Sequence, residues 1–251
     1  MSMIETISFD LWDTLIVDDS DEPKRARLGK PPKNVERVDL VYRALAAEQP
    51  FSRELVEVAC ATANAGFKRV WHDQAVTWTV RERLAVILEG LGRALPAERL
   101  AELVQRLEDM EVEVVPDLVP GAKEALDALR GTYRLALVSD AIFSPGRALR
   151  QILRHHGLVD HFDAFVFSDE VGCSKPNPRV FEVVARQTGC ELAEIVHLGD
   201  RESKDVDGPH AAGARAILVT VAIDRGSEGT NAEATCRDYA DLPHILEELS
   251  T

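Results

Sequence analysis

The sequence predicts an α/β fold with a parallel sheet, interrupted after the first strand by a helical insert. From about residue 115 onward, short apolar segments alternate with longer segments of helical periodicity, which is typical of a parallel sheet covered on both faces. Between about residues 20 and 114, helical periodicity alone is found. The chain has 251 residues, of which 45% are hydrophobic, so it is large enough to bury a sizeable core.

Five short apolar segments are expected to form the sheet, because each gives way abruptly to polar residues. They cover residues 7–9, 135–138, 164–167, 195–198 and 216–221. Asp10, Ser139 and Asp200 fall just past the ends of three of these segments. In open parallel sheets, ligands bind beyond the carboxyl ends of the strands. We therefore expect these three residues at one edge of the sheet.

Helices between and after the strands are indicated by periodicity and by helix breakers. They are expected at residues 120–129, 145–156, 178–188, 205–212 and 242–249. Proline stands at or near the start of several of them, and Gly157, Gly189 and Gly213 follow three of them, as helix ends commonly require. Together with the strands, these helices predict a Rossmann-like three-layer core.

The insert shows four apolar stripes with the spacing of amphipathic helices. They consist of Val38, Val41, Tyr42 and Leu45; of Leu55, Val58, Ala59, Thr62, Ala63, Gly66, Phe67 and Val70; of Val80, Leu84, Ile87, Leu88 and Leu91; and of Leu100, Leu103, Val104 and Leu107. Four such helices predict a small all-helical cap domain at 20–114. The core domain then consists of residues 1–19 and 115–251.

Residues 21–34 precede the first stripe and have the composition of a linker. The segment holds three of the 12 prolines and five Lys or Arg residues. The favoured interpretation is a solvated hinge between the two domains. The alternative is a basic segment that draws in an anionic substrate.

The composition of the chain indicates which classes of partner it is expected to bind. The net charge of −14 disfavours nucleic acid and anionic membranes, because both are negatively charged. The four cysteines are far apart and form no CxxC pair, so neither a zinc site nor a disulfide framework is indicated. The chain shows no secretory signal and no apolar run long enough to span a membrane. We expect a cytoplasmic protein, a monomer or homodimer.

Chemistry is indicated by polar residues at the strand ends. A carboxylate at a strand end, Asp10, can attack phosphorus or an electrophilic carbon if other groups neutralise the developing charge. Asp200 and Asp205 flank a strand-to-helix turn and offer the hard oxygen ligands that suit Mg²⁺. Lys175 would add positive charge, and Ser139 a hydroxyl donor. The site is therefore expected to act on a small phosphorylated metabolite.

Four stretches carry a resemblance to a known family: FDLWDTL at 9–15, VSD at 138–140, SKPNP at 174–178 and GDRESKD at 199–205. They resemble the four motifs of the haloacid dehalogenase superfamily, in the branch with a helical cap after the first motif. The resemblance implies catalytic roles for Asp10, Ser139, Lys175 and Thr14. It implies substrate contacts from Ser139, Asp140, Lys175 and Trp12. It implies a magnesium site formed by Asp10, the backbone carbonyl of Trp12, Asp200 and Asp205.

Trp12 departs from the family pattern, in which phosphatases carry an aspartate two residues after the nucleophile. That aspartate protonates the leaving oxygen and then deprotonates the attacking water. Asp13 is not expected to replace it, because adjacent residues of a loop need not point the same way. Losing a positioned acid or base typically costs about 10² to 10⁴ in rate. We therefore expect leaving groups that need no proton, such as acyl or aryl phosphates.

Three alternatives stay open. The dehalogenases of the family carry a tyrosine at this position and need no metal, so Trp12 also fits a 2-haloacid dehalogenase. Phosphonate hydrolysis would need a cap lysine, for which Lys68 is the candidate. A site without its acid or base could instead bind a phosphorylated ligand without turnover.

Six cap residues are candidates for contact with the substrate, because each has either a cationic or an aromatic side chain. They are Arg69, Trp71, His72, Trp78, Arg81 and Arg83. His72 could also supply the acid or base that Trp12 lacks.

Overall fold

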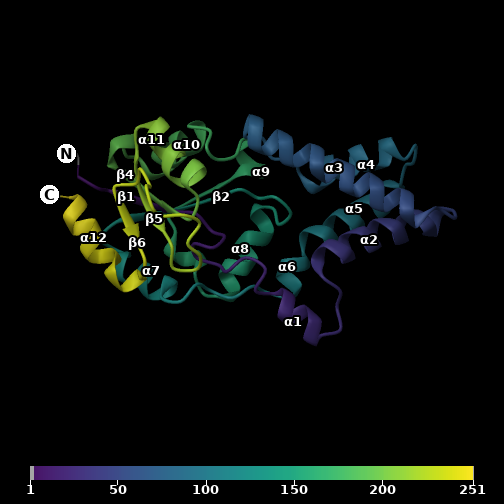
Figure 1. The fold of residues 1–251 in the computed structure, drawn as a ribbon, viewed down its shortest axis with the longest axis horizontal. Helices are drawn as coiled ribbons and strands as arrows, with labels where there is room; N and C mark the ends of the chain where they lie inside the picture. Colours follow the sequence, from purple (N-terminus) through teal and green to yellow (C-terminus); the bar gives the residue numbers. More distant parts are fainter. Residues whose placement is uncertain (1–2, 251) are drawn as a thin grey trace.

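The computed structural model describes residues 3–250. Its α/β part is built around a six-stranded parallel sheet (Figure 1). The strands lie in the order β3-β2-β1-β4-β5-β6. They are β1 (Thr6–Phe9), β2 (Arg134–Ser139), β3 (Ala164–Phe167), β4 (Ile195–Gly199), β5 (Arg215–Val219) and β6 (Ala234–Cys236). The predicted parallel α/β sheet is confirmed. The sixth strand was not predicted, because three residues are too few to show a pattern.

Strand β1 pairs with β2 and with β4, and the three strands end side by side. Phe9 lies opposite Leu137 of β2 and Leu198 of β4. The residues that follow these three strands therefore leave the sheet at the same edge, as the sequence predicted.

Helices cover both faces of the sheet. On one face, α7 (Ala122–Leu129), α8 (Gly146–His155) and α12 (Leu242–Leu249) share a hydrophobic core with alternate residues of the strands. On the other face, α10 (Arg179–Thr188) packs against the remaining strand residues, beside α11 (Asp207–Ala212). The expected three-layer core is thus present.

Between β1 and α7, the described chain forms six helices, drawn to the right of the sheet in Figure 1. They are α1 (Glu22–Arg27), α2 (Lys33–Glu48), α3 (Arg53–Gln74), α4 (Val80–Gly90), α5 (Ala97–Glu108) and α6 (Met110–Glu113). Helices α2 to α5 correspond to the four predicted stripes, and they bury a hydrophobic cluster of their own. The short helices α1 and α6 were not predicted.

Helix α3 buries Ala63 and Phe67 of the predicted stripe, but its buried face is shifted toward Val56 and Cys60, which the stripe did not include. Val56, Cys60 and Phe67 are buried, whereas Leu55 and Val58 are 54% and 63% exposed. Alanines occur on both faces of this helix, so the apolar pattern did not distinguish between them. Even α3, the longest helix, is not apolar enough to cross a membrane, and the same holds for every other helix within residues 3–250.

The segment at 21–34 is not the solvated hinge that its composition suggested. Arg25 and Asp21 are fully buried, and Lys33 is 3% exposed. The Lys33 ammonium donates to Asp21 (Nζ to Oδ1, 2.8 Å) and to Glu111 of α6 (Nζ to Oε1, 2.9 Å). The charges are buried because they pair with acids that are distant in sequence, which composition does not reveal.

Candidate active site

The strand ends and one loop bring the candidate residues together. Asp10 follows β1, Asp140 follows β2 and Asp200 follows β4, all at one edge of the sheet. Lys175 lies in the loop between α9 (Ser168–Val171) and α10. Its backbone N–H donates to Oδ1 of Asp140 (3.0 Å), which fastens this loop to the end of β2.

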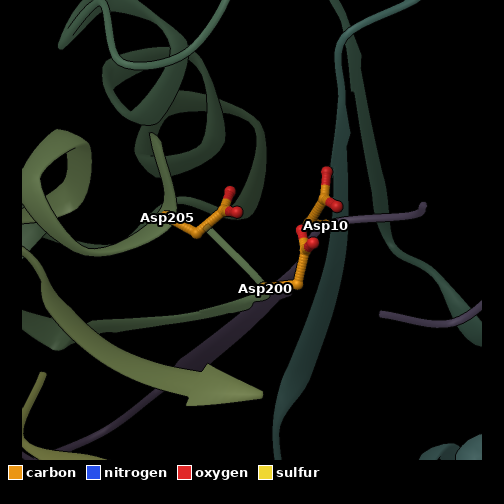
Figure 2. Close-up of side chains that lie close together, drawn as sticks. All are labelled: Asp10, Asp200 and Asp205. Atoms are coloured by element: carbon orange, nitrogen blue, oxygen red, sulfur yellow. The ribbon is translucent and has the colours of Figure 1, made fainter. Parts of the chain in front are cut away.

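Asp10, Asp200 and Asp205 form a buried cluster of carboxylates. Each offers one oxygen, and these three oxygens lie within 4.8 Å of one another. Figure 2 shows the three side chains converging from the end of β1, the end of β4 and the turn that follows β4. Their exposed fractions are 7%, 3% and 1%, respectively. Like charges gathered away from water require positive charge within the site.

Lys175 supplies part of that charge. Its Nζ donates to Oδ1 of Asp10 and to Oδ1 of Asp205, both at 2.5 Å. Burial lowers the pKa of the 2% exposed lysine, but the charges of Asp10 and Asp205 outweigh burial and raise the pKa above its ordinary value. Lys175 therefore stays protonated between the two carboxylates.

One lysine does not neutralise the whole cluster. Burial, assisted by the charges of Asp205 and Asp200, outweighs the opposing effect of Lys175 and raises the pKa of Asp10 to about 8. For Asp205, burial is outweighed by Lys175 and His197, so its pKa lies below the usual range. The nucleophile candidate is thus the carboxyl group that lacks a full counter-charge.

Asp205 is held by a tight turn, not by the first turn of a regular helix as the sequence suggested. Residues Glu202–Val206 form a π-helical turn ahead of α11. Oδ1 of Asp205 also accepts from Nε2 of His197 (3.2 Å), and Oδ2 accepts from the backbone N–H of Arg201 (3.0 Å). A Cβ on Gly199 would lie 2.5 Å from that of Asp205, so the close approach requires glycine.

The residues of the cluster fit a small divalent cation. Within residues 3–250, Oδ2 of Asp10 accepts one long hydrogen bond, from the Thr14 hydroxyl (Oγ1 to Oδ2, 3.5 Å). Oδ1 of Asp200 lies 3.8 Å from Nε of Arg201. These two oxygens are available as hard ligands of the kind that such cations prefer. Both oxygens of Asp205 also accept hydrogen bonds, from Lys175 and from the backbone N–H of Arg201, and Asp205 offers the third oxygen of the cluster.

Trp12 lines the catalytic pocket with a half-buried side chain. The neighbouring Asp13 is turned away from it. Asp13 has a positive φ of 54°, and its carboxylate accepts from Arg225 (Nη2 to Oδ2, 2.5 Å) and from the backbone N–H of Asp18 (3.0 Å). Asp13 therefore does not take the place of the missing acid or base, in line with the expectation from the sequence.

Two other predicted residues are deeply buried. Ser139 is 1% exposed, and its Oγ has no hydrogen-bond partner within residues 3–250. Asp140 accepts from three donors: the Lys175 N–H, Nζ of Lys204 (2.7 Å) and Nε1 of Trp71 (2.9 Å). Ser139 thus keeps an unused hydroxyl, whereas Asp140 is occupied in holding the surrounding loops and the cap.

The cap contacts the core through one of its aromatic residues. Nζ of Lys204 lies 3.4 Å from the centre of the Trp71 ring, and both side chains donate to Asp140. Of the cap candidates, Trp71 lines the catalytic pocket, and Arg83 lines a second cavity described below. His72 is exposed and is absent from the described lining of either.

The catalytic pocket encloses about 220 Å³ and contains residues that the sequence reasoning missed. Lys204, Arg201 and Lys33 line it, as do Asp18 and Glu111. The signal for Lys204 and Arg201 was their position inside GDRESKD. Lys33 belongs to the basic segment 21–34, for which a role in attracting an anionic substrate was the alternative interpretation, whereas Asp18 and Glu111 gave no local signal.

Arg225 was missed as well. Its Nε donates to Oδ2 of Asp200 and its Nη2 to Asp13. It lies in the loop between β5 and β6, where no pattern pointed to a role. It neutralises one oxygen of Asp200 and leaves the other oxygen for a cation.

Comparison with known proteins agrees with this geometry. A family model described as haloacid dehalogenase-like hydrolase matches residues 4–213. Haloacid dehalogenase-like hydrolase domain-containing protein 3 of Mus musculus is 32% identical over 72% of this chain, and the match spans 65% of that relative's length, just under two thirds. Phosphoserine phosphatase of Thermus thermophilus is 35% identical over 79% of this chain and 78% of its own length. A 2-haloacid dehalogenase structure from Pseudomonas syringae pv. Tomato has a TM-score of 0.67 at 21% identity, covering 98% of this chain and 100% of that chain.

The parallel core, the helical insert and the buried carboxylates with their lysine define a hydrolase of the haloacid dehalogenase type. The chain belongs to the haloacid dehalogenase-like hydrolase family, as the match over residues 4–213 and relatives above 30% identity show. The resemblance of the four motifs is confirmed. The structural likeness at 21% identity shows the fold alone.

Proposed function

We propose that the protein is a Mg²⁺-dependent phosphatase that acts on a small phosphorylated metabolite through an aspartyl-phosphate at Asp10. The observation that carries this proposal is the buried trio of Asp10, Asp200 and Asp205 around Lys175. Relatives named as phosphatases support it. We further propose a cytoplasmic location, a core domain of residues 1–19 and 115–251, and a cap of residues 20–114.

The chemistry proceeds in two displacements at phosphorus. A carboxylate oxygen of Asp10 attacks the phosphoryl group, the bond to the leaving oxygen breaks, and the leaving group departs with the electron pair. Water then attacks the phosphorus of the aspartyl-phosphate, loses a proton, and releases phosphate and the Asp10 carboxylate. Lys175 lies against Asp10 and stabilises the negative charge on the phosphoryl oxygens. The unpartnered Ser139 hydroxyl is available to donate to one of them.

Asp10, Asp200 and Asp205, together with the backbone carbonyl of Trp12, would hold Mg²⁺. The ion would supply the positive charge that lets Asp10 ionise beside a phosphoryl anion. The neighbouring Asp13 does not replace the missing proton donor at position 12, because it is bound to Arg225. Leaving groups that are stable as anions, such as aryl or acyl phosphates, should therefore react faster than sugar phosphates.

A screen of aryl, acyl and sugar phosphates and 2-haloacids tests the proposal, with Mg²⁺ or with EDTA. We expect phosphate release that EDTA abolishes. Asp10→Asn should lower it at least about 10³-fold, because the nucleophile is lost. The control Asp73→Asn changes an exposed cap residue and should leave activity intact. Full activity in Asp10→Asn would exclude the proposed nucleophile, and fastest turnover of sugar phosphates would exclude the inferred leaving-group preference.

A 2-haloacid dehalogenase is the second candidate, favoured by the aromatic Trp12 in the pocket wall. Halide release that persists in EDTA would establish it in place of the phosphatase. Phosphonate hydrolysis through a Schiff base is less well supported, because Lys68 of α3 is exposed and is absent from the described lining of the catalytic pocket. A stable aspartyl-phosphate, or ligand-induced stabilisation without turnover, would indicate a phospho-ligand-binding protein instead.

A further inference from the structure

A second cavity, here called the cap cavity, opens beside the catalytic pocket. It encloses about 270 Å³ between helices α2, α3 and α4 and the segment that follows β2. Arg37, Trp71, Ile142 and Phe143 line both spaces. The two spaces are therefore neighbours that share these four side chains.

The lining of the cap cavity is mainly apolar, but it carries three cations. The apolar part includes Val38, Val41, Phe67, Leu84, Ile87 and Phe143. The cations are Arg37, Lys68 and Arg83, and within the described chain no Asp or Glu belongs to this lining. In a protein with a net charge of −14, a cavity lined by cations without acids is an unusual feature.

Arg83 is the most deeply buried of these cations, with 4% of its surface exposed. Its guanidinium lies 4.3 Å from the ring centre of Phe67 and 3.9 Å from that of Phe143. One nitrogen donates to the backbone carbonyl of Ile142. Its Nε has no hydrogen-bond partner, and no carboxylate in the described chain forms an ion pair with it.

Arg37 lies on the same aromatic ring. Its guanidinium is 3.6 Å from the centre of Phe143, its Nε is also without a partner, and its nearest paired acid is Glu111 at 3.9 Å. Burial, together with the charge of Arg37, lowers the pKa of Arg83 to about 9. The two arginines therefore lie close enough to repel each other.

Such an arrangement is costly without an anion. Contacts with aromatic rings recover only part of the hydration that a buried guanidinium loses. The planar fork of each arginine matches a carboxylate, and a carboxylate would relieve the repulsion and use the free Nε–H groups. The apolar walls are suited to the carbon skeleton that carries this carboxylate.

We propose that the cap cavity binds the organic part of the substrate and that Arg83, with Arg37, pairs with a carboxylate on it. The substrate class is then a phosphorylated carboxylic acid with an apolar or aromatic skeleton. This inference rests on the proposed phosphatase function and specifies its substrate.

Matched aryl phosphates test the inference. Phenyl phosphate is compared with phenyl phosphates that carry a para carboxylate on zero, one or two methylene groups, and with a para aminomethyl compound. The best carboxylated member should exceed phenyl phosphate about tenfold or more in kcat/KM, mainly through KM, and the cationic compound should be the poorest. Equal kcat/KM for all compounds would overturn the inference and leave the phosphatase function intact.

Substitutions at α4 assign the effect to Arg83. Arg83→Met should reduce the ratio of carboxylated to plain substrate about 10- to 100-fold, the effect expected for a lost charge-assisted hydrogen bond. Arg81→Met, on the exposed face of the same helix, should leave the ratio unchanged. An unchanged ratio in Arg83→Met would overturn the assignment. If that variant does not fold, Arg83→Lys, which keeps the charge without the fork, should lower the ratio partly.

Binding separates this inference from the proposed reaction. Asp10→Asn is titrated, in Mg²⁺, with benzylphosphonate and with 4-carboxybenzylphosphonate and its longer homologues. Tighter binding of a carboxylated ligand supports the inference even if no phosphate ester is turned over, an outcome that would overturn only the phosphatase proposal. Equal binding of all these ligands would overturn the inference.

Discussion

The catalytic pocket and the cap cavity differ in how their buried charges are balanced. In the catalytic pocket, Lys175 is bonded to both Asp10 and Asp205. In the cap cavity, Arg83 has no acidic partner in the described chain, and Arg37 has only a distant one. In the catalytic pocket the protein supplies a cation between its buried carboxylates and leaves room for a second one, whereas in the cap cavity it supplies no anion for Arg83.

This difference assigns the reaction to the catalytic pocket and the selection of the substrate to the cap cavity. A pre-formed network around Asp10 costs no reorganisation when charge develops at the phosphoryl group. Unpaired arginines in the cap favour one class of ligand and disfavour ligands without an anion. The core therefore determines the reaction, and the cap cavity determines which molecule undergoes it.

Replacing each buried cation by methionine should produce the largest contrast between the two regions. Lys175→Met leaves Asp205 and Asp10 without their shared partner, so it should lower the free energy of unfolding by about 3–5 kcal/mol. Arg83→Met removes a charge that lacks a counter-ion, and the change should stay within about 1 kcal/mol of zero. Denaturant unfolding in EDTA at neutral pH measures both.

Two results would contradict this contrast. A large loss of stability in Arg83→Met would mean that the cap arginine is held by its ring contacts and by the Ile142 carbonyl. An unchanged stability in Lys175→Met would mean that the pairing with Asp10 contributes nothing to the fold. Arg81→Met serves as the surface control for both.

Trp12→Asp should change the reaction without changing the selectivity. An aspartate here would restore a proton donor for poor leaving groups, so hydrolysis of alkyl phosphates should rise about 10- to 100-fold. Aryl phosphates, whose leaving groups need no proton, should gain less. The preference for a carboxylated substrate should persist, since Trp12 is absent from the described lining of the cap cavity. Steady-state kinetics on paired alkyl and aryl phosphates measure this.

The outcome that would contradict the argument is a folded Trp12→Asp protein with no gain on alkyl phosphates. A matched variant, Trp12→Phe, keeps an aromatic ring without a proton donor and should show no such gain.

The core and its reacting groups could be predicted because their signals are local. Asp10 and Asp200 stand directly beyond short apolar strands, and parallel strands end at one edge. Lys175 lies within a short stretch with two prolines. Arg225 could not be found in this way, because its contacts with Asp13 and Asp200 join distant segments through a loop.

In the cap, more of the structure depends on contacts between distant segments, so less of it could be predicted from the sequence. Its helices were predictable from periodicity, but the buried face of α3 was not, because its alanines make both faces similar. Arg83 was recognised as polar, yet its burial depends on Phe143, which comes from the segment after β2. Lys33 appeared to be part of a solvated linker until its pairing with Glu111 was seen. The sequence does not show which charged side chains contact residues far along the chain, and therefore does not show which of them are buried.

The smallest expected effect concerns pH. The pKa of Asp10 is raised to about 8, chiefly by burial, so between about pH 4 and pH 8 the folded state holds a proton that the unfolded chain has released. The free energy of unfolding of the wild type should therefore fall as pH rises through this window and level off above it. Asp10→Asn lacks this group. Its stability relative to the wild type should increase from pH 4 to pH 9 by about 1–3 kcal/mol, less than the full shift because Lys175 shares the pair.

Melting curves in EDTA at several pH values measure the difference. Asp205, whose pKa is lowered, contributes the opposite slope, but it is present in both proteins and largely cancels. Adding Mg²⁺ at pH 9 should stabilise the wild type, because the ion binds ionised Asp10, and should stabilise Asp10→Asn less. A stability difference that does not change between pH 4 and pH 9 would mean that Lys175 alone keeps Asp10 ionised, and that the core site, unlike the cap cavity, is fully neutralised without any ligand.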